Sequence, residues 1–479
     1  MVGKQKNNKK VNMDKAPVKV SERNNLQTLV KLMQEILDNQ ADDLGSLEKI
    51  RTGYTKLTRE DRAPFFSLLQ ETIELEPGAI ASLAADLTRD QNDPAKWRQA
   101  LVKLRSGAES PRQRLFRYFI RVPWGLKFLL DLRADLLAAQ SRGGPDLGPL
   151  DSDLVHLFES WFQDGFLFLS EITLDSPYRQ IEIIKNGDMV HPMSGLEEMG
   201  RRLGRDRRCF ALYHCAMPQE PVVFIEVALT YGVARSIHEI IGPLNRSTEA
   251  RPDTAVFYSI NNTQNGLAGL GLGKVLIFQV VDFLERENEN IRNFCTLSPV
   301  PGFWRRYLQP LIEGRAENFK MKLEDLEKLF DKRTRSLLEK QHQKQGGQKD
   351  DAFADMLLKV FSSTDWSDDK QLATNLAKPI KTLGYFYLAE EKDRAGRPLD
   401  PVANFHLSNG ATLSAANVNF GANWTTMGLE RSLSLMVNYI YSQRWTRQIS
   451  ESMAWLGGLL PGLSRSWTGK WRMENAKEG

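Results

Sequence analysis

Three glycines at alternate positions form the first candidate for a chemical site in this sequence. Gly269, Gly271 and Gly273 lie in the run Gly-Leu-Gly-Leu-Gly, which Lys274 and a stretch with the apolar spacing of a helix follow. Because glycine has no side chain, the backbone N–H groups of such a turn can approach an anion closely. The helix dipole adds roughly half a positive charge at this end. The run therefore predicts a phosphate-binding turn, although three glycines can also serve packing alone.

Ser298 and His406 are the side chains best suited to chemistry on a bound group. Ser298 lies in a loop stiffened by two prolines, and His406 lies in Asn-Phe-His-Leu-Ser-Asn-Gly, which we interpret as the end of a strand. The serine loop is not the Gly-x-Ser-x-Gly elbow of hydrolases, so no acyl-enzyme is indicated, and composition alone would favour a turn-forming serine. An unperturbed imidazole has a pKa near 6.5 and can donate a proton at neutral pH. Other histidines are interpreted as inert or structural: His156, His191, His214 and His342.

Several segments resemble known proteins that bind acyl-CoA. The glycine spacing is neither that of a P-loop nor that of the dinucleotide fingerprint, and it is similar to the pyrophosphate loop of acetyltransferase-like folds. Three blocks resemble the malonyl-CoA decarboxylase family: residues 257–273, residues 297–303 around Ser298, and residues 401–411 around His406. A fourth block, residues 191–230, resembles the start of the catalytic half of that family, and weaker similarity covers most of the chain.

The resemblance implies a reaction and a set of site residues. The reaction is decarboxylation of malonyl-CoA to acetyl-CoA and carbon dioxide through an enolate, without metal, biotin or another cofactor. Ser298 and His406 would be catalytic and hold the malonyl group, and Tyr441 would lie near the acyl end. The backbone expected to bind the pyrophosphate of CoA comprises Ala268, Gly269, Leu270, Gly271, Leu272, Gly273 and Lys274. Family members can carry glutamate where Gly271 stands, so a role for that carboxylate is in doubt here.

Two other functions remain open at this point. An acyl-CoA-dependent acyltransferase would need a base near the thioester and a groove for an amine, and no motif for either stands out. A non-catalytic CoA-binding scaffold would not need Ser298 and His406, which are both present. The resemblance also implies a homo-oligomer, expected to be a tetramer.

Composition limits the classes of partner and compartment. The chain has 479 residues, of which 41% are hydrophobic and 26% charged, with a net charge of only +4, so no nucleic-acid partner is indicated. No apolar run reaches the 18 residues typical of a membrane span. The three cysteines cannot form a disulfide framework and show no zinc-site spacing. The first residues are rich in lysine and asparagine and unlike a transit peptide. We therefore expect a metal-free cytoplasmic protein.

The N-terminal third is expected to be helical. After a disordered tail at residues 1–24, apolar residues recur at helical spacing from Leu26 to Leu37, and Thr58 is a candidate helix start ahead of Pro64. Further helices are expected near residues 78–90, 94–106, 111–140, with a break at Pro123, and 151–164. An excess of large apolar residues at 115–137 could face a partner subunit or the other domain. We place a helical oligomerisation domain at residues 25–168.

The remainder, residues 169–479, is expected to be a mixed α/β catalytic domain. Strands are expected at 222–229, 256–260, 293–297, 383–388 and 402–407, and helices at 195–204, 232–240, 272–288 and 427–446. A charged amphipathic helix at 317–345 belongs to an expected helical insertion at 308–380. The expected fold class is α+β: an all-helical N-terminal domain followed by an acetyltransferase-like (GNAT-like) domain that carries a helical insertion.

Overall fold

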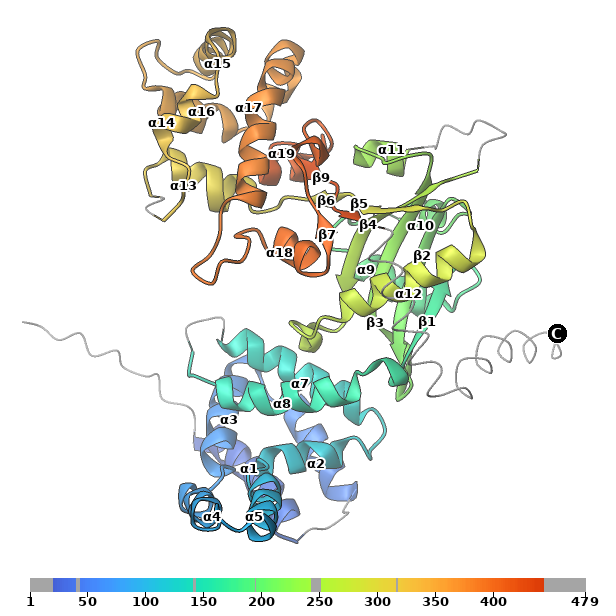
Figure 1. The fold of residues 1–479 in the computed structure, drawn as a ribbon, viewed down its shortest axis with the longest axis vertical. Coiled ribbons are helices and arrows are strands. Elements are labelled where there is room, and N and C mark those ends of the chain that lie inside the picture. Colours follow the sequence, from blue (N-terminus) through green and yellow to red (C-terminus); the bar gives the residue numbers. More distant parts are fainter. Residues whose placement is uncertain are drawn as a thin grey trace, which may run out of the picture. The chain divides into compact units, whose positions relative to one another are not determined.

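The computed structural model describes residues 20–39, 44–140, 144–193, 195–242, 251–315 and 318–442. The chain forms two compact units, which Figure 1 draws as a ribbon. The first comprises the described residues of Met1–Phe166 together with Gln264–Leu270, and the second comprises those of Leu167–Thr263 and Gly271–Gly479. The expected N-terminal tail falls mostly on residues 1–19, which lie outside the described residues, and the first helix begins at Val20.

The first unit is built of helices. They are α1 (Val20–Asn39), α2 (Leu44–Thr55), α3 (Arg59–Thr72), α4 (Pro77–Arg89), α5 (Pro94–Gly107), α6 (Pro111–Phe119), α7 (Gly125–Gln140) and α8 (Gly148–Trp161). The predicted start at Thr58 is confirmed, because its side chain and that of Asp61 cap α3 reciprocally. The predicted break at Pro123 is also confirmed, since α6 ends at Phe119 and α7 begins at Gly125.

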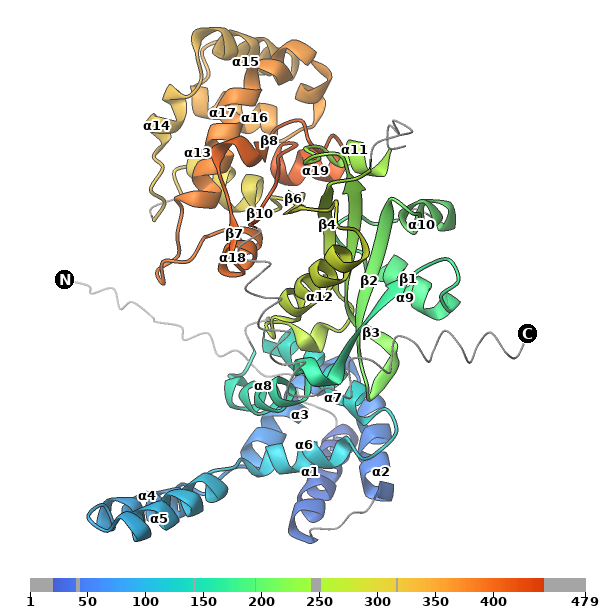
Figure 2. The same cartoon turned by 45° about the vertical axis from the view of Figure 1, so that its right-hand side comes forward.

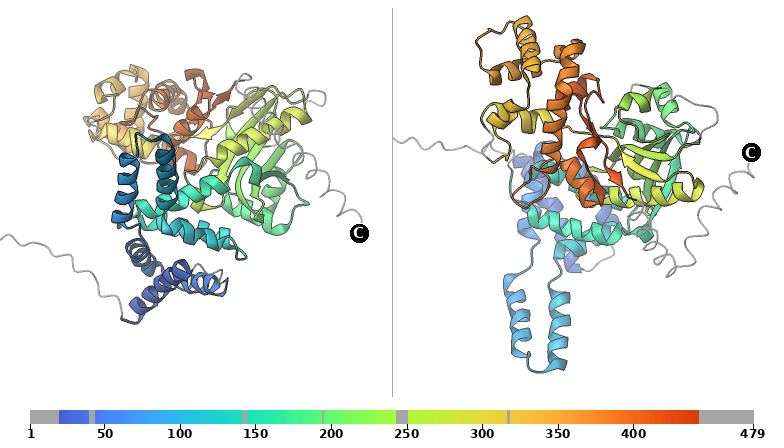
Figure 3. Two further views of the ribbon diagram at one scale, coloured as in Figure 1. Left: turned by 60° about the horizontal axis from the view of Figure 1, so that its bottom comes forward. Right: turned by 45° about the horizontal axis from the view of Figure 1, so that its top comes forward.

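The large apolar residues at 115–137 are mainly packed inside this unit. Leu115, Phe116 and Leu129 are fully buried, whereas Trp124 remains 50% exposed. By contrast, α4 buries none of its residues and α5 buries only Ala100. Figure 2 and the right-hand view of Figure 3 show these two helices as an antiparallel hairpin that extends away from the other helices of the unit.

The second unit is organised around a seven-stranded sheet in the order β1-β2-β3-β4-β5-β10-β7. The strands are β1 (Leu167–Ile172), β2 (Arg207–His214), β3 (Met217–Thr230), β4 (Thr254–Asn262), β5 (Asn293–Thr296), β7 (Ala411–Thr412) and β10 (Ile440–Tyr441). Neighbours are antiparallel except β4 and β5, which are parallel and joined through helix α12 (Leu272–Glu287). The strand, glycine loop, helix and second strand thus follow one another in the order expected from the sequence, and the two strands are parallel neighbours.

Helices cover both faces of this sheet (Figure 1). Phe210 of β2 packs against Phe283 of α12. Its neighbour Cys209 packs in a cluster with Ile181 and Ile184 of α9 (Tyr178–Gly187). Because successive residues of a strand face opposite sides, α12 and α9 lie on opposite faces. Two shorter helices are α10 (Leu196–Arg202) and α11 (Ile237–Ile241).

A small second sheet has the order β6-β9-β8, with β6 (Ser298–Pro299), β9 (Met436–Val437) and β8 (Val418–Asn419). The chain changes from the large sheet to the small one between Thr296 and Ser298, and changes back between Val437 and Ile440. The helices after β6 in the described residues are η3 (Phe303–Leu308), α13 (Gln309–Ile312), α14 (Leu323–Lys328), α15 (Lys332–Lys344), α16 (Phe353–Phe361), η4 (Asp365–Asp368), α17 (Lys370–Ala389), α18 (Pro401–Ser408), η5 (Ala415–Asn417) and α19 (Thr426–Ser432).

Five of the expected elements are wrong in type or extent. The helix expected at 232–240 begins only at Ile237, after a cap at Ser236. Residues 383–388 and 402–407 are not strands but parts of α17 and α18, whose N-termini are capped by Asp369 and Asp400. The helix expected at 427–446 ends at Ser432, because Leu433 and Ser434 adopt positive φ and the chain then forms β9 and β10. The charged helix expected at 317–345 is two helices, since Asp331 caps a new start before α15.

The expected fold class is confirmed: helices come first, and a mixed α/β domain with a helical insertion follows. In the ranges described, no helix is long and apolar enough to cross a membrane. Within the same residues, no group of three or more His, Cys, Asp or Glu side chains is arranged to hold a metal ion.

Candidate active site

Ser298 and His406, which are 108 residues apart in sequence, meet inside the second unit. The serine Oγ lies 3.3 Å from Nε2 of the imidazole. Both side chains are buried, with 7% of Ser298 and 3% of His406 exposed. The two residues singled out by type and context are therefore neighbours, and their contact is the centre of the candidate site.

The imidazole is held on two further sides. Its Nδ1 lies 2.9 Å from the hydroxyl of Tyr441, the third residue expected at the acyl end. The ring of Tyr439 stacks on it, with centroids 4.7 Å apart and an angle of 25° between the planes. Both ring nitrogens and one ring face of His406 are therefore engaged, which leaves the imidazole a single orientation.

Short elements place these groups. His406 lies in the last turn of α18. At the start of this helix, Asp400 accepts the N–H of Ala403 at 2.8 Å and Pro401 occupies the first helical position. Ser298 begins β6, immediately after the chain has left the large sheet. The expected strand end at His406 is thus wrong, and a capped helix supplies the side chain instead.

Three residues that support the site were not foreseen: Thr296, Asn438 and Tyr439. The hydroxyl of Thr296 accepts the N–H of Tyr439 at 3.1 Å and the hydroxyl of Ser298 at 3.0 Å. Asn438 donates to the carbonyl of Thr296 at 2.7 Å. A signal was present, because Thr296 and Asn438 are polar residues inside otherwise apolar runs, where a buried polar group needs a partner.

The contacts fit the tautomer of the imidazole that carries its proton at Nε2. In this tautomer Nε2 of His406 donates to the serine oxygen, and Ser298 donates to Thr296. Nδ1 accepts from the hydroxyl of Tyr441. In this arrangement proton donation runs from Tyr441 through His406 and Ser298 to Thr296.

Burial determines the charge of this chain of groups. Complete desolvation lowers the pKa of His406 to about 3, and burial raises the pKa of Tyr441. The ring is therefore neutral at pH 7 in the free protein. The expectation of an ordinary imidazole with a pKa near 6.5 is wrong, because it did not take this burial into account.

The glycine loop has the backbone that its sequence predicts. Gly269 and Gly271 have φ values of +85° and +70°, in the left-handed region that favours glycine, and an added Cβ at either would meet open space. Gly273 differs, because a Cβ there would lie 3.0 Å from the ring of Phe405, the neighbour of His406. The loop and the imidazole are thus linked through one aromatic side chain.

Unpaired N–H groups collect at the start of α12. The N–H groups of Gly269, Gly271, Leu272 and Gly273 donate to no acceptor among the described residues. The first N–H groups of a helix lack partners within the helix, and together with the dipole they attract anions. Lys274 follows, is exposed, and adds a cationic side chain.

A second feature suited to an extended ligand lies beside the loop. β5 pairs with β4 only from Thr254 to Phe257, whereas β4 continues to Asn262. In the part of the chain that the structure describes, no strand pairs with the β5 side of residues 258–262. A strand edge of this kind offers free N–H and C=O groups to a ligand that contains amides.

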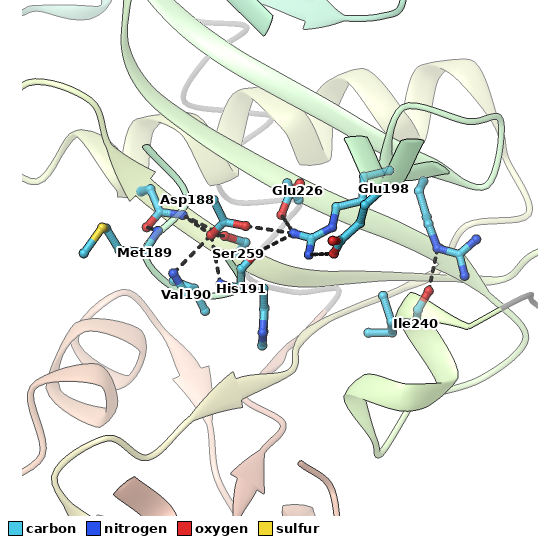
Figure 4. Close-up of polar contacts among 11 residues, drawn as sticks. Asp188, Met189, Val190, His191, Glu198, Glu226, Ile240 and Ser259 are labelled. Carbon is cyan, nitrogen blue, oxygen red and sulfur yellow. Dashed lines mark hydrogen bonds and ion pairs between the residues drawn. The ribbon is translucent and has the colours of Figure 1, made fainter. Parts of the chain in front are cut away.

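His191 belongs to a separate buried network, which Figure 4 shows. Asp188 accepts from the hydroxyl of Ser259 at 2.8 Å and from the N–H of His191 at 3.0 Å, and it pairs with Arg202 at 2.8 Å. Burial lowers the pKa of His191 to about 4 and raises the pKa of Glu226. Through Ser259 this network ties the loop after α9 to the part of β4 whose edge is free.

Comparisons with known proteins cover both parts of the chain. Residues 75–162 match the family described as "Malonyl-CoA decarboxylase N-terminal domain", and residues 165–460 match "Malonyl-CoA decarboxylase C-terminal domain". The protein named "Malonyl-CoA decarboxylase, mitochondrial" from Rattus norvegicus is 34% identical over 390 residues, which are 79% of this chain and 76% of that protein. The protein of the same name from Anser anser anser is 32% identical over 406 residues, or 83% and 77%.

Solved structures agree with these matches. The crystal structure of malonyl-CoA decarboxylase from Rhodopseudomonas palustris has a TM-score of 0.72 and 31% identity, and the match covers 90% of this chain and 97% of that one. The structure from Agrobacterium vitis has a TM-score of 0.71 and 31% identity, with coverage of 89% and 96%.

Proposed function

The chain belongs to the malonyl-CoA decarboxylase family, and from this premise we propose how its site converts malonyl-CoA to acetyl-CoA and carbon dioxide. The observation that carries the proposal is the buried contact between Ser298, His406 and Tyr441 in the same unit as the start of α12. A decarboxylase needs to hold a carboxylate, stabilise an enolate and return one proton to carbon. The three side chains offer groups for each of these tasks.

The glycine loop and the free edge of β4 would bind the CoA part of the substrate. We place the pyrophosphate over residues 268–274, where the N–H groups of Gly269, Gly271, Leu272 and Gly273 have no acceptor among the described residues. The amides of the pantetheine arm would add to the β4 edge at residues 258–262, as an extended peptide adds to a sheet. Gly271 carries no carboxylate, so the proposed reaction uses none at this position.

The loss of carbon dioxide would begin with the hydroxyl of Ser298 turned from Thr296 to the malonyl carboxylate, to which it donates. Breaking the bond between the carboxylate carbon and the α-carbon leaves its electron pair on the α-carbon and the thioester oxygen. A donor aimed at this developing charge is worth on the order of 3 kcal/mol. The N–H at Nε2 of His406 is such a donor, and it needs no charge of its own.

Protonation at carbon would complete the reaction. The enolate carbon of a thioester is a much stronger base than a phenolate, so a neutral donor suffices. In the proposed step the proton at Nε2 of His406 moves to carbon while the hydroxyl of Tyr441 passes its proton to Nδ1. The phenolate left at Tyr441 then takes a proton from solvent. A positioned acid of this kind typically contributes about 10²–10⁴-fold.

A direct assay tests the proposal. Purified full-length protein is supplied with malonyl-CoA, labelled with ¹³C in the free carboxylate, in D₂O and without an amine acceptor. We expect labelled carbon dioxide and acetyl-CoA with one deuterium in the methyl group. Turnover only after an amine is added would favour the acyltransferase, and binding without turnover would favour the scaffold. Methylmalonyl-CoA in a parallel reaction measures substrate breadth.

The helical unit is our candidate for self-association into a homo-tetramer. The support is the α4–α5 hairpin, which carries apolar residues yet buries only one of them, and the exposed side chains of Trp124 and Val102. Analytical ultracentrifugation at micromolar concentration should give four times the monomer mass. A monomer under these conditions would refute the proposal, and Val102→Glu should shift the distribution towards smaller species.

We propose the cytoplasm as the compartment. The three cysteines, Cys209, Cys215 and Cys295, are free, as is usual where thiols are kept reduced. The relatives from rat and goose are named as mitochondrial. Fractionation of cells against marker proteins of both compartments distinguishes the two locations.

A further inference from the structure

A buried arginine of the helical unit reaches the backbone just before the glycine loop. Nη1 of Arg133, in α7, donates to the carbonyl oxygen of Gly266 at 2.6 Å and to that of Ala268 at 3.0 Å. Its Nε donates to Asp151 of α8 at 2.7 Å. Only 4% of Arg133 is exposed. The guanidinium therefore has a fixed position, and it bridges two helices and one loop.

The loop also lies directly on the backbone of α7. A Cβ placed on Gly266 would come 2.0 Å from the carbonyl oxygen of Leu130, so glycine is needed for this approach. Residues 264–270 belong to the same compact unit as α7 and α8. The first half of the glycine loop is thus packed as part of the helical unit, although its sequence lies inside the α/β region.

The two arginine contacts determine which way the loop amides point. A peptide unit is planar and trans, so its C=O and the following N–H point in opposite directions. Because the carbonyl of Ala268 points at Arg133, the N–H of Gly269 points away from α7. That N–H is one of those without an acceptor in the described ranges. The positive φ of Gly269 then turns the chain towards the start of α12.

We propose that Arg133 is a positioning residue for CoA binding, which holds the glycine loop in the shape that presents its N–H groups to the pyrophosphate. The inference rests on the proposed function of that loop. It gives the helical unit a second task besides self-association, because a side chain of α7 shapes the substrate site. Arg133 itself does not touch the reacting atoms.

A matched control is available in the same unit. Arg112 is also buried, pairs with Asp153 at 2.6 Å and donates to the carbonyl of Ile73 at 2.8 Å, but none of its contacts reaches the loop. Arg133→Met and Arg112→Met each remove a buried arginine from a carboxylate and a carbonyl. A general loss of stability should affect both variants, whereas a change in the loop should affect only the first.

The test measures the Kd for free CoA by calorimetry and the kinetics with two substrates. Arg133→Met should weaken CoA binding by about tenfold or more, as expected for lost hydrogen bonds to a charged donor. KM for malonyl-CoA should rise with kcat little changed. The kcat/KM for malonyl-pantetheine, which lacks the pyrophosphate, should match the wild type. Arg133→Lys should recover part of the affinity.

Several results would overturn the inference. Unchanged CoA affinity in Arg133→Met would do so, and so would an equal loss in Arg112→Met or an equal loss with malonyl-pantetheine. If Arg133→Met does not fold, Asp151→Ala, which removes the acceptor of Nε but keeps the charge of the arginine, should still raise the Kd for CoA, and an unchanged Kd would count against the proposal. Failure of the proposed function is distinguishable, because the wild type would then release no carbon dioxide from malonyl-CoA, and failure of the proposed role of the loop would show as no binding of CoA by the wild type.

Discussion

Replacing His406 by asparagine tests the proposed chemistry most directly. The amide oxygen of asparagine can occupy the place of Nδ1 and accept from the hydroxyl of Tyr441, so this contact at 2.9 Å can persist. The group at Nε2, 3.3 Å from Ser298, is lost. Glutamine at the same position reaches the Nε2 side instead. Neither amide can transfer a proton as an imidazole does, so both variants should be impaired for the same chemical reason.

The expected size of the effect follows from the role of the ring. A positioned acid contributes about 10²–10⁴-fold, which corresponds to about 3–5 kcal/mol of the activation barrier. Affinity for free CoA should be retained, because the N–H groups of the glycine loop do not involve His406. Loss of buried hydrogen bonds should also destabilise the fold by about 1–3 kcal/mol. Turnover is therefore compared at a temperature where circular dichroism shows the variant to be folded.

The assay follows acetyl-CoA formation in single-turnover and steady-state experiments, together with the Kd for CoA. His342→Asn is a matched control, because His342 is equally buried and pairs with Asp351 at 2.7 Å within the helical insertion. It should decarboxylate at the wild-type rate. The mechanism is wrong if His406→Asn does the same. If its Kd for CoA rises as much as its turnover falls, His406 acts in binding rather than in the chemical step.

Four further predictions address the surroundings of this ring. Tyr441→Phe should lower kcat and leave KM unchanged, and full activity would remove the hydroxyl from the mechanism. Gly269→Val should raise the Kd for CoA by calorimetry, because a β-branched residue strains a φ of +85° and reshapes the loop, with little change in secondary structure because its Cβ clashes with nothing; an unchanged Kd would place the pyrophosphate elsewhere. Thr296→Val removes the oxygen that two donors share. It should lower the free energy of unfolding in urea by about 1–3 kcal/mol and lower kcat more than it raises KM. Wild-type stability and kcat in this variant would show that Thr296 does not support the site. Burial lowers the pKa of His406 to about 3 and that of His191 to about 4, below the 6.5 of an unfolded chain. As the pH falls, the unfolded state therefore binds protons before the folded state does. The free energy of unfolding should be steady above about pH 6.5 and decline below it, by on the order of 1 kcal/mol per pH unit for each histidine. Urea unfolding of His406→Asn should show a shallower decline, and identical curves for variant and wild type would contradict the neutral buried ring.

The parts that could be predicted from sequence are those with a local cause. Gly269 and Gly271 adopt positive φ, which few other residues tolerate, so their spacing carried direct information on the turn. The helix after them has an apolar face at the helical period, and β4 is a β-branched and aromatic run. The cap at Thr58 is also local, because its side-chain oxygen accepts the backbone N–H of Asp61 within the same four residues.

The wrong assignments occur where a helix cap or a longer helix overrides the local apolar composition. Asp400 and Pro401 form a cap and a first helical residue, a stronger indication than the apolar composition of residues 402–407. The aromatic run at 383–388 has β propensity, but it lies at the end of a helix that began at Lys370. Propensity is a weak prior when a longer element continues through the segment. The turn at Leu433 and Ser434 has positive φ without glycine, for which no sequence rule exists.

The geometry of the site depends on contacts between segments that are distant in sequence. The change of sheets after Thr296 depends on pairing with β9 and β10, whose strands are only two residues long and carry almost no periodicity of their own. That pairing brings Tyr439 and Tyr441 to two sides of His406, and the burial it produces lowers the pKa of the ring to about 3. From its sequence context alone, His406 is an ordinary acid with a pKa near 6.5. In the fold it is a neutral ring between a phenol and a serine, so in the proposed mechanism the proton for carbon comes from a neutral N–H that Tyr441 replenishes.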